Sequence, residues 1–217
     1  MTAGPVPEPS TTTTGLLIHT PIRYDLRAWW HARGRADEFR AEEVRLARVR
    51  AGDRVLDVGC GTGSLTIAAA RAAGPTGRVV GIDPSLEMVR WARTKARLFR
   101  RHVEFVATAG EALPFPADAF DVVTMSLVLH QLPSDALHGT MSQVQRVLAP
   151  GGRLLLVDLD LSAPTGNTVH ARRHGAAGHG DQRFDLDRVG LLVEHIGLEI
   201  VERGPITFRF RGLEPLR

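Results

Sequence analysis

Short apolar runs alternate with amphipathic stretches along most of the chain. Five runs have the length and apolar character of buried strands, and they cover residues 54–58, 78–82, 102–107, 120–125 and 153–159. Helical spacing of apolar residues, bounded by Ser, Gly and Pro, predicts helices at 64–73, 85–100 and 134–148. This alternation is typical of a mainly parallel sheet with helices on both faces.

The parts before and after these runs have other patterns. Residues 1–15 are rich in Pro, Thr and Gly, so we expect a flexible tail there. Residues 16–50 carry a helix-like pattern and predict a helical cap in front of the main domain, 51–217. Within that domain, the polar, Gly- and His-rich stretch 162–184 predicts a long variable loop.

The last part of the chain predicts one helix, at 186–195, and two strands, at 198–203 and 206–211. Gly204-Pro205 separates the two strands, which would form an antiparallel hairpin. With the five earlier runs, they predict one α/β domain. Its sheet would have seven strands and be mainly parallel, with only the last strand antiparallel.

The composition bounds the kind of protein that this chain can be. Its 217 residues are 43% hydrophobic, enough for one globular domain with a buried core. No run approaches the ~18 apolar residues of a membrane span, and the first residues lack a signal-peptide pattern, so we expect a cytoplasmic location. The single cysteine, Cys60, excludes an internal disulfide and fits a reducing compartment.

The distribution of charge argues against a nucleic-acid partner. The formal net charge is only +3, and the positive charge is scattered arginine, with Lys95 as the one lysine. The densest cluster lies at the end of a predicted helix, where the helix dipole favours basic side chains: Arg97, Arg100 and Arg101. We expect a small-molecule substrate and leave the oligomeric state open, with a homodimer as one option.

A glycine turn after the first strand is the strongest chemical signal. The stretch 55–63 reads VLDVGCGTG, with glycines at 59, 61 and 63 directly before a helix. Glycine lets the backbone turn sharply and approach a ligand closely, and the free N–H groups of the helix point to the same place. The dinucleotide pattern G-x-G-x-x-G would need a third glycine at position 64, which is Ser64.

A carboxylate at the end of the second strand is the second signal. Asp83, in the stretch GIDPS (81–85), follows the glycine turn by about twenty residues. A carboxylate there can accept hydrogen bonds from both hydroxyls of a ribose. Because NAD and SAM sites share this feature, it predicts an adenosine cofactor without choosing between the two.

With two later stretches, these residues resemble class I methyltransferases that use S-adenosylmethionine (SAM). The nearest branch is that of the ubiquinone/menaquinone-biosynthesis C-methyltransferases and related small-molecule enzymes. The later stretches are EALPFPADAFDVV (111–123) and VLAPGGRLLLVD (147–158), and the resemblance covers about residues 40–160. It implies a Rossmann-like fold and methyl transfer from SAM to a small, apolar or aromatic acceptor at O, N or C.

The resemblance also assigns a cofactor site. Asp57 and the glycine turn would face the methionine part of SAM, and Asp83 would hold the ribose. The full set of expected cofactor residues is Asp57, Gly59, Cys60, Gly61, Gly63, Asp83, Pro84, Ser85, Ala109, Gly110, Glu111 and Ser126. One position departs from the family, which has Gly-Asp-Ala before the Glu-x-Leu-Pro-Phe stretch. The Asp that bonds the adenine amino group is replaced here by Ala109, with Gly110 after it.

Catalytic and substrate residues are expected beyond the fourth and fifth strands and in the cap. His130, in SLVLHQL (126–132), is the candidate general base and a candidate substrate contact. Asp158 follows the fifth strand, at the same edge, and could contact substrate, although loop solvation or helix capping is the slightly favoured role. An aromatic pocket is expected from the cap, with packing as the alternative role of its residues: Tyr24, Trp29, Trp30 and His31.

Several alternatives stay open or are disfavoured by the residues. His170, His174 and His179 have metal-like spacing, but no carboxylates or thiols support them, so we expect no metal and a loop that could act as a lid. The fold could also bind SAM without methylating, as a regulatory module or a cyclase-type scaffold. A nicotinamide oxidoreductase is disfavoured by Ser64, and a nucleic-acid methyltransferase by the lack of Asn/Asp-Pro-Pro-Tyr/Phe after the fourth strand.

Overall fold

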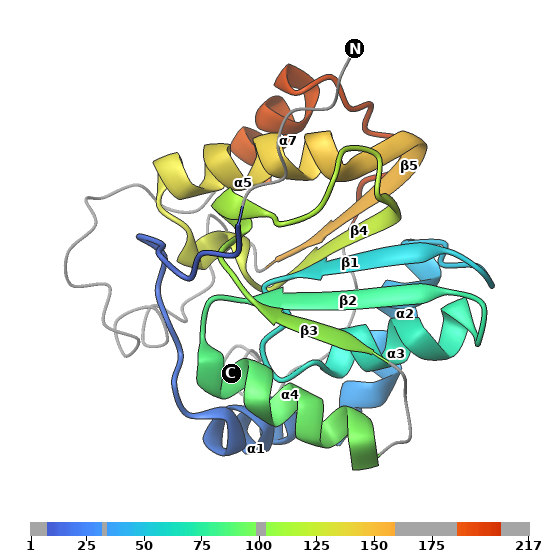
Figure 1. Cartoon of the computed structure of the whole chain (residues 1–217). Helices are drawn as coiled ribbons and strands as arrows, with labels where there is room; N and C mark the ends of the chain where they lie inside the picture. The colour runs from blue at the N-terminus through green and yellow to red at the C-terminus, as the bar shows by residue number, and fades with distance from the viewer. Residues whose placement is uncertain (1–7, 32–33, 99–102, 159–185, 205–217) are drawn as a thin grey trace, which may run out of the picture.

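A five-stranded parallel sheet forms the centre of the molecule. The computed structural model describes residues 8–31, 34–98, 103–158 and 186–204. The strands, in the order β3-β2-β1-β4-β5 across the sheet (Figure 1), are β1 (Arg54–Val58), β2 (Arg78–Asp83), β3 (Glu104–Ala107), β4 (Phe120–Ser126) and β5 (Leu148–Val157). All four pairings are parallel.

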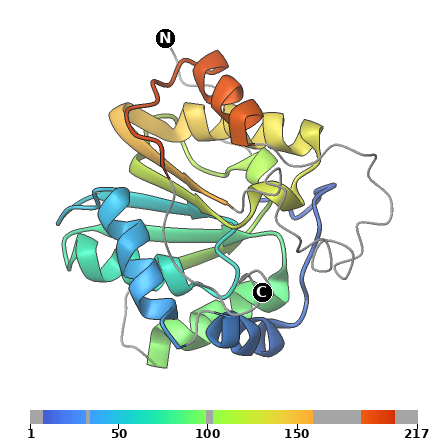
Figure 2. The same cartoon turned by 180° about the vertical axis from the view of Figure 1, so that it is seen from behind.

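Helices cover both faces of the sheet (Figures 1 and 2). One face packs against α5 (Ser134–Val147) and α7 (Leu186–His195). The other face carries α2 (Ala36–Leu46), α3 (Ser64–Ala73) and α4 (Leu86–Leu98), and α1 (Pro21–His31) packs against α4. Two short 3₁₀ turns, η1 (Gly110–Ala112) and η2 (Leu129–Gln131), follow β3 and β4.

Successive residues of each strand point to opposite faces, which gives the sheet two buried layers. Leu56 of β1 belongs to the cluster that includes Met141 and Val144 of α5. Its neighbour Val55 packs with Ala69 of α3 on the other side. Both strand residues are fully buried, and burying a side chain of this size contributes roughly 2 kcal/mol. Because both faces are covered, the strands are apolar runs and not alternating ones.

The order of the strands places the ligand site. From β1 the chain builds outward to β2 and β3, and it then returns to add β4 and β5 on the other side of β1. The connections that leave β1 and β4 therefore diverge, and they leave a crevice at the carboxyl edge of the sheet. The turns that follow β1, β2, β3 and β4 all reach this edge.

The expected seven strands are not found in the described part of the chain. The segment Leu198–Arg203, predicted as a strand, has no regular secondary structure, and its expected partner, 206–211, lies outside the described residues. Gly197 (φ 78°) ends α7, and the Leu198 N–H bonds back to the Val193 carbonyl. Leu198 packs against the core, whereas Ile200 and Val201 remain 38% and 77% exposed, so most of the apolar pattern that suggested a strand stays at the surface. The predicted loop, 162–184, also lies outside the described residues.

The second half of the segment predicted as a flexible tail contacts the main domain. Residues 8–15 are described, and they lie against the turn after β3. The N–H of Ala109 donates to the Ser10 carbonyl at 2.6 Å, and the N–H of Ser10 donates to Thr108 Oγ1 at 3.1 Å. Polar composition predicted mobility because it ignores backbone hydrogen bonds, whose partners here lie 98 residues or more away.

Candidate functional site

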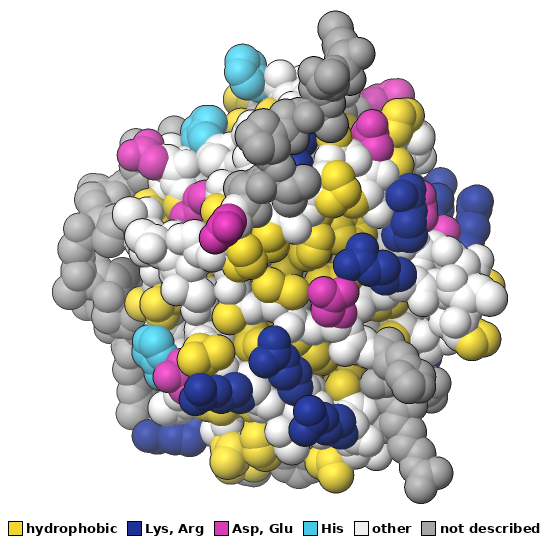
Figure 3. Space-filling model, viewed as in Figure 1, with side chains coloured by type: hydrophobic (Ala, Val, Ile, Leu, Met, Phe, Trp, Pro, Cys, Tyr) yellow, Lys and Arg dark blue, Asp and Glu magenta, His cyan; other side chains and the backbone are white. Residues whose placement is uncertain are grey.

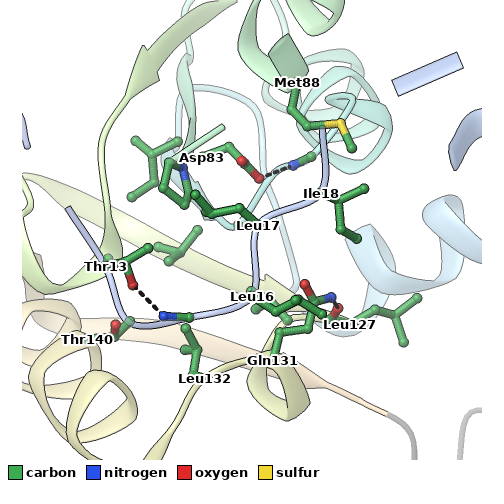
Figure 4. Close-up of a pocket in the computed structure, with 18 of the residues that line it drawn as sticks. Thr13, Leu16, Leu17, Ile18, Asp83, Met88, Leu127, Gln131, Leu132 and Thr140 are labelled. Atoms are coloured by element: carbon green, nitrogen blue, oxygen red, sulfur yellow. Dashed lines mark hydrogen bonds between the residues drawn. The ribbon is translucent and has the colours of Figure 1, made fainter. Parts of the chain in front are cut away.

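A small cavity lies at the carboxyl edge of the sheet, over the ends of β1, β2, β3 and β4 (Figure 4). Its volume is about 70 Å³. Eight of the expected site residues line it, namely Tyr24, Gly59, Gly61, Asp83, Pro84, Gly110, Glu111 and Ser126. The other walls come from the N-terminal segment, from α4 and α5, and from the turn after β4.

The glycines of the turn after β1 have different tasks. Gly59 (φ 71°) has no room for a side chain, since a Cβ there would lie 2.5 Å from Val128. A Cβ on Gly63 would likewise clash with Phe105. Gly61 (φ 52°) differs, because a Cβ at this position would meet nothing closer than Tyr24, 4.0 Å away. Only Gly61 therefore leaves bare backbone facing open space, as a cradle for a ligand requires.

Asp83 lies at the end of β2 and is held by backbone donors. Its Oδ2 accepts the N–H of Gly61 at 2.9 Å, and its Oδ1 accepts the N–H of Ser85 at 2.8 Å. Burial raises the pKa of Asp83, and these two hydrogen bonds oppose the rise. A carboxylate has about four acceptor positions, so each oxygen keeps one for a ligand. Ser85 itself is buried and caps α4 through the Met88 N–H.

Asp57 and Cys60 lie beside the cavity and not in its wall. The Asp57 carboxylate is buried, and it accepts hydrogen bonds from Thr66 at 2.6 Å and from Thr124 at 2.9 Å. It thereby fastens α3 and β4 to the end of β1. Burial raises the pKa of Asp57 to about 6. Cys60 packs with the cluster between α3 and α4, and burial raises the pKa of its thiol well above the usual value.

Ser126, the last residue of β4, is held by a buried ion pair that the sequence did not reveal. Its hydroxyl donates to Glu43 and accepts from Arg40 Nη1 at 2.9 Å. Arg40 also bonds Glu43 at 2.7 Å, and the Glu43 side chain is 0% exposed. The next residue, Leu127, has a positive φ (56°), which is strained for a branched side chain. Both Ser126 and Leu127 line the cavity.

The N-terminal segment crosses the mouth of the cavity (Figure 4). The hydroxyl of Thr13 donates to Glu111 at 2.7 Å, and the N–H of Leu16 donates to the Gln131 carbonyl at 3.1 Å. Leu17 and Ile18 complete this wall. Sequence reasoning missed this contribution altogether, because a Pro- and Thr-rich segment carries no signal for the surface that it will cover.

His130 and Asp158 form a close pair next to the cavity. His130 Nδ1 lies 2.6 Å from Asp158 Oδ1, and the His130 N–H donates to Asp158 Oδ2 at 3.2 Å. The Asp158 side chain is 0% exposed and that of His130 is 25% exposed. With a carboxylate at Nδ1, the proton of a neutral imidazole lies on Nδ1 and its lone pair on Nε2. Neither residue lines the cavity, but Val128 and Gln131 beside His130 do.

The remaining candidates are placed only in part. Burial raises the pKa of Tyr24, which stays protonated in the wall beside Gly61. Trp29, Trp30 and His31 belong to the last turns of α1, and their side chains fall outside the described part. Ala109 is fully buried behind the wall that Gly110 and Glu111 form. His170, His174 and His179 also fall outside the described residues.

The surface, the polar clusters and the helices add three observations. On the face shown in Figure 3, Lys and Arg side chains are scattered among apolar and acidic ones and form no continuous stripe. Within the described ranges, no group of three or more His, Cys, Asp or Glu side chains could hold a metal ion. In the same ranges, no helix is both long and apolar enough to cross a bilayer.

Comparison with known proteins agrees with this architecture. A methyltransferase-domain family model matches residues 55–152. A demethylmenaquinone methyltransferase from Listeria welshimeri is 38% identical over 122 residues, which cover 56% of this chain and 51% of that protein. A ubiquinone/menaquinone biosynthesis C-methyltransferase from Hahella chejuensis is 34% identical over 167 residues, 76% of this chain and 66% of that protein. The crystal structure of YcgJ from Bacillus subtilis matches with a TM-score of 0.61 and 28% identity, covering 73% and 68% of the two chains.

Residues 55–152 therefore match a methyltransferase domain, and the chain has the Rossmann-like fold with a parallel sheet of that class. It is similar to enzymes of the ubiquinone/menaquinone-biosynthesis branch, which the sequence motifs also resemble. It spans about half the length of the first curated relatives that it matches.

Proposed function

We propose that this protein transfers a methyl group from SAM to the ring of a small aromatic acceptor of the quinone type. The observation that carries the proposal is Asp83. This carboxylate lines the cavity, is fixed by the backbone of Gly61 and Ser85, and keeps one acceptor position on each oxygen. Two adjacent hydroxyls, as on a ribose, match that arrangement.

The order of the strands then predicts how the cofactor is oriented along the carboxyl edge of the sheet. With the ribose at β2, the adenine would lie over β3 and η1, near Gly110 and Glu111. The amino-acid tail would run the other way, over β1 and β4, past the bare backbone of Gly61 toward Ser126. The cavity is lined by residues from the ends of β1, β2 and β4 and from the turn after β3, and these strands stand in the order β3-β2-β1-β4 in the sheet.

The cofactor needs more room than the cavity offers. Pockets for ligands of this size measure about 300–1,000 Å³, whereas this one measures about 70 Å³. The segment 13–18 lies across the mouth of the cavity, where Thr13 and Leu16 form hydrogen bonds with Glu111 and Gln131. We infer that this segment moves outward when the cofactor binds, and that the sheet and its turns keep their positions.

The pair of His130 and Asp158 supports an acid–base role at the acceptor end. SAM supplies a methyl group on a positively charged sulfur, which is a good leaving group without further activation. The protein must orient the acceptor, exclude water and take the proton that a hydroxylated ring carries. A buried carboxylate at Nδ1 orients the imidazole, stabilises the imidazolium once formed, and leaves Nε2 as the accepting atom.

The relatives suggest the chemical class of the acceptor. Their names specify demethylmenaquinone and the ubiquinone/menaquinone pathway. A ring of that kind is apolar, planar and, when reduced, carries hydroxyls that His130 could deprotonate. Methylation at carbon would then be followed by loss of the ring proton.

The test is methyl transfer from labelled SAM to a reduced, short-chain demethylmenaquinone. We expect labelled, methylated quinone together with one S-adenosylhomocysteine (SAH) per methyl group. His130→Gln should lower kcat by about 10²- to 10⁴-fold with little change in SAH affinity. Asp158→Asn should lower kcat in the same direction. SAH release without a labelled quinone would reject the acceptor, and full activity of His130→Gln would reject the base.

A further inference from the structure

One buried hydroxyl in the wall of the cavity has no partner. Thr140, in the second turn of α5, is 0% exposed and lines the cavity. Its Oγ1 forms no hydrogen bond with the described residues. Buried hydroxyls are nearly always paired, because an unpaired one loses its bonds to water without compensation. A ligand that enters the cavity could supply the missing bond.

Thr140 lies at the end of the cavity where the adenine is expected. It packs directly against Gly110, since a Cβ on Gly110 would lie 2.7 Å from Thr140 Oγ1. Thr108 and Glu111 line the same end, and Figure 4 shows Thr140 below Thr13 of the segment that crosses the mouth. Outward movement of that segment would open the space in front of Thr140.

Two departures from the family meet at this point. The carboxylate that bonds the adenine amino group in the family is absent, because position 109 is Ala109, which is buried and outside the cavity wall. The following residue is Gly110 where the family has alanine, and only glycine leaves room for Thr140. The chain thus lacks the carboxylate at position 109, and glycine at position 110 lets the Thr140 hydroxyl approach the expected position of the adenine.

We propose that the Thr140 hydroxyl accepts a hydrogen bond from the exocyclic amino group of adenine, and so replaces the missing carboxylate. The proposal rests on the proposed use of SAM. Thr140 is then a specificity-determining residue for the cofactor, and Gly110 is the residue that allows it to reach the base. A neutral hydroxyl gives a weaker bond than a carboxylate would.

The experiment measures the affinity of two probes for two threonine variants by calorimetry. The probes are SAH and its purine-riboside analogue, which lacks only the 6-amino group. Thr140→Val has nearly the same shape and removes an unpaired buried group, so it should fold at least as stably as the parent. Thr94→Val is the control, because Thr94 is exposed on α4 and bonds only its own helix.

We expect the parent and Thr94→Val to bind SAH about five- to ten-fold more tightly than the purine analogue. Thr140→Val should bind both probes alike, at the affinity of the parent for the analogue. Thr140→Ser, which keeps the hydroxyl, should restore most of the preference. If Thr140→Val keeps the full preference for SAH, Thr140 does not recognise the amino group. If the parent binds neither probe, the proposed function itself fails.

Discussion

Replacement of Asp57 by asparagine should change how stability depends on pH. In the folded protein, burial raises the pKa of Asp57 from 3.8 to about 6, although hydrogen bonds from Thr66 and Thr124 oppose the rise. Arg40 also lowers this pKa, and Glu43 raises it. The folded state therefore holds the proton at pH values where the unfolded chain has released it. Stability from this group is fully present below pH 3.8 and is lost as the pH rises through about 6.

The magnitude follows from the shift of the pKa. A rise from 3.8 to about 6 corresponds to about 3 kcal/mol lost from the free energy of unfolding at neutral pH. Roughly half of that loss falls between about pH 5 and pH 7.5. The asparagine side chain cannot ionise, and it can accept from one threonine and donate to the other. The free energy of unfolding of Asp57→Asn should therefore not decrease in this way as the pH rises.

Urea denaturation of both proteins at several pH values measures the difference. We expect the free energy of unfolding of the parent, minus that of Asp57→Asn, to fall by about 1–2 kcal/mol between about pH 5 and pH 7.5. Any constant difference from changed hydrogen bonds cancels in this comparison. A difference that stays the same at every pH, or that rises, would refute the raised pKa and the protonated state that it implies near pH 5.

Three further outcomes follow from the packing around the site. Gly110→Ala should destabilise the protein by about 1–3 kcal/mol, because its Cβ would meet Thr140. Gly190→Ala, inside α7, is the control, because its Cβ would meet nothing closer than 3.6 Å, and it should be neutral or stabilising in thermal unfolding. An equal effect of the two would contradict the contact. A chain that begins at His19 should bind SAH with a faster association rate in stopped flow, and an unchanged rate would show that segment 13–18 does not obstruct entry. The double variant Arg40→Met, Glu43→Leu should fold, since neither buried charge is left alone. Its SAH affinity should nevertheless fall about ten-fold or more. Unchanged SAH affinity would show that this ion pair does not position Ser126 for the cofactor.

The sequence predicted those parts of the fold that depend on local pattern. The five apolar runs are all strands, and the three in the middle of the sheet, β1, β2 and β4, are buried on both faces, as their apolar residues indicate. Asp83 was predictable for a related reason, since a residue directly after a strand must reach the carboxyl edge. His130 and Asp158 were each expected at that edge, but their contact joins residues 28 apart and depends on the pairing of β4 with β5.

Other parts of the site have no local signal. The helix α2 and the residue before it carry three Arg–Glu pairs at i,i+3 spacing, and only the pair of Arg40 and Glu43 is buried. Spacing alone cannot tell which pair faces the sheet. Residues 8–15 are held by hydrogen bonds to distant turns, and no periodicity reports such bonds. The absence of a strand at 198–203 has the same origin, because a strand requires a neighbour as well as a pattern.

Calorimetric titration of the purified chain with SAH tests the central claim most directly. We predict binding of one SAH per chain, and a loss of affinity of about 10- to 100-fold in Asp83→Asn, which removes the charged acceptor for the ribose hydroxyls. Thr94→Val should bind like the parent. No measurable binding of SAH to the parent, or equal binding by Asp83→Asn, would contradict a SAM site at this edge of the sheet.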